Sequence, residues 1–117
     1  MYKIFGILKR PENMPFDEFK SWWLNEHAPK VKKWKGLLKY KINFCTSGSQ
    51  DFDGVAEVWF EEKQAMDAVF SSEYGQIARQ SATSGSSQIV VLLTEEHAVV
   101  LKLAFKHFRL LVSGFTI

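Results

Sequence analysis

Cysteine is almost absent from this chain of 117 residues, in which Cys45 stands alone. One cysteine cannot form a disulfide within the chain, and such scarcity is typical of proteins in a reducing compartment. No uncharged apolar run reaches the roughly 18 residues that a membrane-spanning helix needs. The segment MYKIFGILKRPENM has too short an apolar run for a secretory signal and lacks a small-residue cleavage site. We therefore expect a cytoplasmic protein without a membrane span.

The usual sequence patterns of metal, phosphate and nucleophile sites are missing as well. The pairs Glu26–His27 and Glu96–His97 are adjacent, so neither has the i, i+4 spacing with which a helix presents two ligands to one ion. None of the seven glycines belongs to a dinucleotide-binding or P-loop pattern. Cys45 lacks the basic or helix-N-terminal context that activates a thiol. We expect no metal and no cofactor.

Positive charge is concentrated rather than abundant, because the formal net charge is only +2. No acid occurs between Glu26 and Asp51, and the lysines of this segment are Lys30, Lys32, Lys33, Lys35, Lys39 and Lys41. Lysines interleaved with aromatics can bind single-stranded nucleic acid through phosphate contacts and stacking. A solvated face that keeps a sheet edge soluble is the simpler interpretation, and steering of an anionic small molecule is a third. We expect no nucleic-acid partner.

Apolar periodicity predicts a strand followed by a helix in the first third of the chain. Residues 2–9 are apolar on both alternations, which is typical of a strand covered on both faces. Pro15 suits the first position of a helix, and Pro29 ends or kinks it, with a short helical continuation up to Gly36. The helical spacing places on one side Phe16, Phe19, Trp23 and His27.

The rest of the chain predicts two strands, a helix and a last strand. These are strands at 37–45 and 55–61, a helix at 62–70 that frays through 71–80, a flexible polar loop at 81–88 and a fully buried strand at 89–94. In the first of these strands, alternation places on one face Leu38, Tyr40, Ile42 and Phe44.

The predicted order β-α-β-β-α-β corresponds to an α+β, ferredoxin-like fold, with a four-stranded antiparallel sheet and both helices on one face. Two helices cover only one face of the sheet, yet the predicted strands carry apolar residues on both faces. The uncovered face needs a partner, and a second copy of the chain is the simplest one. We therefore predict a homodimer in which two sheets enclose a shared barrel.

Residues 19–40, FKSWWLNEHAPKVKKWKGLLKY, resemble the EthD-like family of the dimeric α+β barrel superfamily. The residues that carry the resemblance are Phe19, Trp23, His27, Pro29, Gly36, Leu37 and Tyr40. Residues 53–61 and 92–100 also resemble later segments of the family, so the predicted domain spans 1–100. The chain departs from the family at 78–88, where members usually carry an Asp and an aromatic residue.

The resemblance implies that His27 lies in a cleft between helix and sheet. The helix's negative end would favour its protonated form, whereas burial would favour the neutral one. It would then act as a general acid or base, unless it is a packed histidine bonded to backbone carbonyls. Tyr40 is the second catalytic candidate, as a proton donor or an orienting group, although an ordinary core tyrosine is the stronger interpretation of this residue.

Three aromatic residues are candidates for substrate binding: Phe19, Trp23 and Trp59. Strand register decides whether Trp59 lines the pocket or the dimer barrel. Trp22 lies off the stripe of Trp23 and His27, so we expect it to pack on a loop or a dimer surface.

Two functions from different classes follow from the resemblance. The first is a small cofactor-free enzyme that dehydrates, cyclises or isomerises an aromatic or polyketide-like metabolite by acid–base chemistry at His27. The second is a non-catalytic dimeric protein that binds a hydrophobic ligand or assists a degradative oxygenase system. A catalytic site needs His27 and a second polar group around one void, whereas a carrier needs only the void.

The segment 101–117 lies beyond the resemblance and has its own pattern. Apolar residues recur there at three- and four-residue steps, with Lys102, Lys106 and Arg109 on another side. We predict an amphipathic helix that docks on its own domain or across the dimer. Binding to a membrane surface and a disordered or non-native extension are the alternatives.

Overall fold

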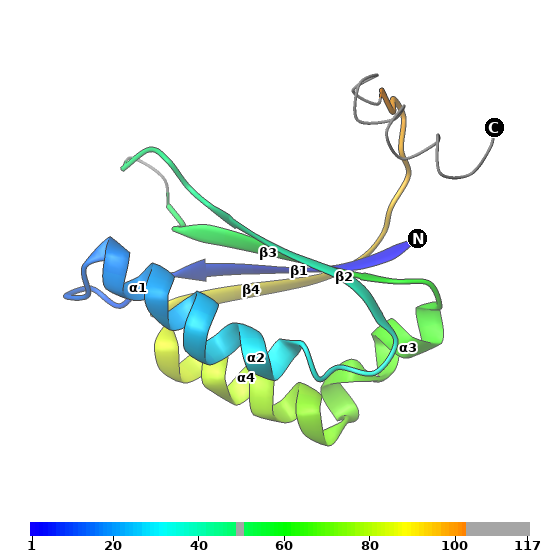
Figure 1. Ribbon diagram of the computed structural model, residues 1–117, viewed down its shortest axis with the longest axis horizontal. Coiled ribbons are helices and arrows are strands. Elements are labelled where there is room, and N and C mark those ends of the chain that lie inside the picture. Colours follow the sequence, from blue (N-terminus) through cyan, green and yellow to red (C-terminus); the bar gives the residue numbers. More distant parts are fainter. Residues whose placement is uncertain (49–50, 103–117) are drawn as a thin grey trace, which may run out of the picture.

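Four antiparallel strands form one sheet in the computed structural model, which describes residues 1–48 and 51–102 (Figure 1). The strands are β1 (Tyr2–Lys9), β2 (Leu37–Phe44), β3 (Gly54–Phe60) and β4 (Gln88–Glu95). They lie in the order β2-β3-β1-β4, and every pair of neighbours is antiparallel. This arrangement confirms the predicted α+β, ferredoxin-like fold.

Two helical segments cover one face of the sheet (Figure 1). The first runs from α1 (Phe16–Trp22) through a π-helical turn (Trp23–His27) into α2 (Ala28–Val31). The second runs from α3 (Lys63–Ala68) through a 3₁₀ turn (Val69–Ser71) to α4 (Glu73–Gly85). Pro29 sits in the first turn of α2, directly after the π-helical turn, and helical backbone continues to Val31, so Pro29 does not end the helical segment.

The helix α4 corrects the prediction of a fraying end at 71–80 and a loop at 81–88. Ser72 caps it, because its Oγ accepts a hydrogen bond from the Gly75 backbone N–H at 3.1 Å. Serine, threonine and glycine have modest helix propensity, which is why the segment reads as a loop. Its helical state is stabilised by packing, since Ala78 and Ala82 are buried against the rest of the domain.

The core lies between the helices and the sheet, and both layers contribute alternate or periodic side chains. Its most deeply buried members include Ile4, Leu8, Phe19, Trp23, Val58, Phe60, Met66 and Ala78. The turn into β2 contains Gly36 at φ +81°, a backbone conformation that favours glycine. A register irregularity follows between Leu37 and Lys39, so Leu37 packs on the core and Leu38 is exposed, contrary to the predicted alternation.

Among the described residues, no helix lies over the other face of the sheet (Figure 1). The register of β1 with β4 places on this open face Phe5, Ile7, Val90 and Leu92. The last strand is an edge strand, and Val90 and Leu92 are 37% and 46% exposed, so the prediction of a fully buried strand is wrong for the single chain. A strand with apolar residues on both faces needs a second covering layer to be buried.

Residues 103–117 lie outside the described part of the chain, and with them most of the predicted amphipathic helix. Within residues 1–48 and 51–102, no helix has the length and apolar character required to cross a bilayer.

Candidate functional site

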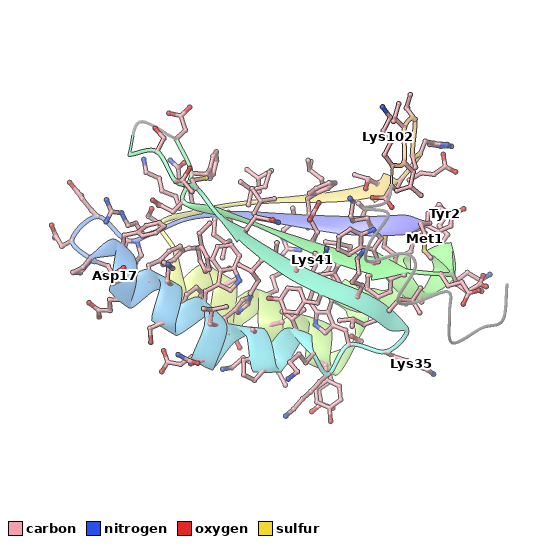
Figure 2. All side chains as sticks on the ribbon, turned by 45° about the horizontal axis from the view of Figure 1, so that its top comes forward. Met1, Tyr2, Asp17, Lys35, Lys41 and Lys102 are labelled. Atoms are coloured by element: carbon pink, nitrogen blue, oxygen red, sulfur yellow. The ribbon has the colours of Figure 1, made fainter. Side chains whose placement is uncertain are left out.

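A small cavity of about 50 Å³ lies between the helical layer and the sheet. Figure 2 shows that side chains fill the space between the helices and the sheet. Its walls are mostly apolar, formed by residues such as Leu8, Val31, Ala56, Val58 and Val91. Among the described residues, the side chains with polar atoms that line it are Trp23, His27, Trp34, Tyr40 and Arg79. The cavity therefore brings together both residues that the sequence suggested as catalytic.

His27 is buried at the end of the π-helical turn, with 6% of its surface exposed. Its Nδ1 lies 3.0 Å from the hydroxyl of Ser81 on α4, which fixes the orientation of the ring. Burial lowers the pKa of His27 to about 4, and the nearby charge of Lys30 acts in the same direction. The imidazole is therefore neutral at pH 7, so desolvation outweighs the attraction of the helix's negative end.

The π-helical turn determines what stacks on His27. In this turn the Ala28 N–H donates to the Trp23 carbonyl five residues earlier, which brings residues five apart over one another. The ring of Trp22 consequently stacks on His27, with centroids 5.2 Å apart and an interplanar angle of 17°. The prediction that Trp22 packs on a loop or dimer surface depends on α-helical spacing, and it is wrong because Trp22 stacks on Phe19 and His27.

Two buried donors of the cavity lack partners. Neither the Tyr40 hydroxyl nor the Trp23 indole N–H makes a hydrogen bond within the described residues. Burial raises the pKa of Tyr40 to about 12, while the neighbouring Trp23 N–H lowers it by a smaller amount, so the phenol stays protonated. The two groups are close but do not satisfy hydrogen-bond geometry with each other. An unpaired buried donor costs about 1–3 kcal/mol, so this part of the cavity favours a ligand or water oxygen.

The two other aromatic candidates lie outside the cavity. Phe19 is completely buried and stacks under Trp22, with ring centroids 5.5 Å apart, so it positions the rings beside His27. Trp59 lies on the open face of the sheet, because β3 alternates and its neighbours Val58 and Phe60 face the helices. Its indole N–H donates to Glu96 Oε1 at 3.0 Å.

Sequence reasoning missed the contribution of α4 to the site. Ser81 binds His27, while Ala78, Arg79 and Ala82 line the cavity. The sequence did contain one indication of a helix here, because Ala78 and Ala82 are four residues apart in a segment whose other residues predict a fraying end and a loop. Arg79 is the charged member of the described lining, and its guanidinium carbon lies 5.5 Å from the ring centroid of Phe70.

Metal-binding residues do not cluster in the part of the chain that the structure describes. No group of three or more His, Cys, Asp or Glu residues there has the arrangement of a metal site. The polar groups of the cavity suit a hydrogen-bonding organic ligand.

A profile of the EthD domain family matches residues 11–83, which is more than half of the chain. The chain belongs to the EthD domain family. The match includes His27, Tyr40, Arg79 and Ser81, so the family region contributes both helical sides of the cavity. No match was found among curated proteins.

Solved structures share the fold of this EthD domain protein. An ethyl tert-butyl ether d family protein from Bacillus halodurans is 19% identical with a TM-score of 0.74, covering 83% of this chain and 99% of that one. HapK from Hahella chejuensis is 12% identical with a TM-score of 0.67, covering 89% and 100%. A dimeric protein of ferredoxin-like fold from Bacteroides fragilis is 10% identical with a TM-score of 0.62, covering 81% and 95%. At these identities the likeness establishes the fold alone.

Proposed function

We propose that this EthD domain protein is a cofactor-free enzyme that dehydrates, cyclises or isomerises an aromatic or polyketide-like metabolite. The observation that carries the proposal is one apolar cavity shared by a neutral, oriented imidazole and two buried donors without partners. Such reactions require a positioned proton-transfer group and a site that excludes water. His27 and the surrounding apolar walls supply both.

His27 acts in this scheme as the base. When Ser81 Oγ accepts a hydrogen bond from Nδ1–H, Nε2 carries the lone pair and takes a proton from a carbon or hydroxyl of the substrate. The resulting imidazolium is destabilised by burial, so it returns the proton readily to another atom of the substrate. Abstraction and return at different atoms constitute an isomerisation, and return to a departing hydroxyl constitutes a dehydration.

Tyr40 and Trp23 act as the electrophilic side of the site. Removing a proton next to a carbonyl places negative charge on the carbonyl oxygen, and preoriented donors stabilise that charge most in a dry environment. The phenol stays protonated at neutral pH and the indole is a donor only, so both can bond such an oxygen. Neither group makes a hydrogen bond to another described residue, so neither has to break one in order to bind the substrate oxygen.

The enzyme is a homodimer in this proposal. The open face of the sheet carries exposed apolar side chains on β4, and the similar protein from Bacteroides fragilis is dimeric. Facing the two sheets would remove these side chains from water and form the barrel.

A non-catalytic carrier of a hydrophobic ligand is the second candidate. The mainly apolar lining supports it, because apolar walls alone suffice to hold such a ligand. The presence of His27, whose nitrogen is oriented by Ser81, favours the enzyme, since a carrier needs no oriented base.

Crystals soaked with aromatic ketones and unsaturated lactones test the proposal directly. We expect density in the cavity, with a ligand oxygen within hydrogen-bond distance of Tyr40 Oη or Trp23 Nε1 and the carbon next to the ligand carbonyl facing His27. Ligand density only on the open sheet face, with the cavity unoccupied, would contradict the proposed site.

A further inference from the structure

Arg79 brings a positively charged side chain to the lining of an otherwise uncharged cavity. Arg79 lines the cavity together with Phe70 and is also exposed to solvent. Its side chain therefore connects the cavity with solvent. No acidic residue belongs to the described lining. A ligand that enters here meets a cation first and apolar walls behind it.

The guanidinium of Arg79 is available for a ligand. The ion pairs found among residues 1–48 and 51–102 do not involve Arg79, whose charged group instead lies against the ring of Phe70 at 5.5 Å. A guanidinium presents donors in a planar fork that matches a carboxylate.

The size of the cavity determines how a ligand is placed. About 50 Å³ is smaller than the roughly 150 Å³ of an apolar cavity that holds benzene. A small apolar group fits inside, and the remainder of a larger ligand extends past Phe70 and Arg79. A polar end group would then lie next to the guanidinium.

We propose that the substrate is an amphipathic carboxylic acid whose apolar end enters the cavity and whose carboxylate binds Arg79. The inference rests on the proposed function, because it assigns the substrate class of the same site. It makes Arg79 a specificity-determining residue, separate from the proton chemistry at His27.

Matched acids and amides test the inference. The probes are 3-methylbutanoate and butanoate, each compared with its own amide, and binding is followed by NMR through the indole N–H of Trp23. We expect each acid to bind about tenfold more tightly than its amide, the low end for a hydrogen bond to a charged group, because the guanidinium is exposed. The preference should weaken at high ionic strength.

Two variants separate the role of Arg79 from general charge. Arg79→Gln should abolish the preference for the acids while leaving the affinity for the amides unchanged. Lys33→Gln is the control, because Lys33 is also a cation over an aromatic ring, that of Tyr74 at 5.7 Å, but does not line the cavity. This control should retain the full preference.

The outcomes distinguish the inference from the proposed function. Equal affinity for acid and amide, or a preference that survives Arg79→Gln, overturns the inference and leaves the cavity as a ligand site. If neither acids nor amides perturb the Trp23 indole, the cavity does not admit ligands of this kind, and the proposed function fails together with the inference.

Discussion

His27 and His97 illustrate how position alone gives two histidines different chemistry. His97 is exposed and pairs with Glu95 at 3.0 Å, whereas His27 is buried between Trp22 and Ser81. Burial disfavours the imidazolium of His27, so this residue holds a neutral base in a place that water does not reach easily. The same neutrality couples His27 to the stability of the fold.

We predict that stability falls as the pH drops from 6.5 towards 4. In that window the unfolded chain protonates His27, whose ordinary pKa is 6.5, while the folded chain does not until about pH 4. The unfolded state therefore binds more protons, so the free energy of unfolding rises with pH across the window, by about 3 kcal/mol at most. Urea unfolding of wild type and His27→Gln measures this contribution.

The control for this experiment is His97→Gln, which should keep the wild-type pH dependence. His27→Gln should flatten it between pH 4 and 6.5. If the free energy of unfolding changes with pH equally in wild type and His27→Gln over this window, the claim that His27 is buried in its neutral form is contradicted.

At the scale of elements, the packing of the π-helical turn against α4 builds the site. The turn places Trp22 over His27, and α4 supplies Ser81 and the close approach of Gly85. A Cβ on Gly85 would lie 2.0 Å from Cζ2 of Trp22, so no other residue leaves room for that ring. The two helical segments thus fix the histidine from both sides.

Gly85→Ala should therefore displace Trp22 and destabilise the fold by about 1–3 kcal/mol, the usual cost of overpacking. We also expect the His27 imidazole signals in NMR spectra to shift, because their stacking partner moves. Ser84→Ala, at the exposed neighbouring position of α4, should change neither. Unaltered stability and imidazole signals in Gly85→Ala would show that the close approach of Gly85 to Trp22 is not required to hold this ring beside His27.

The elements also show what could be predicted from sequence. The strand at residues 2–9 could be predicted because apolar residues occur there on both alternations, as in a strand covered on both faces. The position of His27 in a cleft was implied by the resemblance to the family, while four-residue spacing placed His27 on the stripe of Trp23. The π-helical turn could not, since residue spacing does not reveal a change of helical pitch. The contribution of α4 was missed because its serines and threonines resemble a loop until tertiary packing makes them helical.

At the scale of the whole molecule, the open sheet face is the apolar surface that no helix of the described residues covers. Alongside its apolar residues it carries Lys3, which is buried at 8% exposure and pairs with Glu57 at 3.3 Å and with Glu96. Trp59 bonds the same Glu96, and the ammonium of Lys39 lies 4.2 Å from the Trp59 ring centroid. Charges already paired within one chain reduce the cost of covering this face with a second copy.

Leu92→Glu should convert the proposed dimer to a monomer, because it places a charge on the apolar part of the open face. Leu24→Glu is the matched control, since Leu24 is similarly exposed but lies in the helical layer. Sedimentation across a dilution series measures both. A wild-type protein that remains a 13.5 kDa monomer at micromolar concentration would contradict the dimer.

The central claim is that His27 transfers protons within the cavity, and deuterium exchange measures this most directly. Wild-type protein is incubated in D₂O with aromatic ketones and unsaturated lactones, and NMR follows deuterium incorporation next to the carbonyl. We predict catalysed exchange that falls about 10²- to 10⁴-fold in His27→Gln and remains in His97→Gln, with both variants folded. Catalysed exchange that persists unchanged in folded His27→Gln would contradict the account.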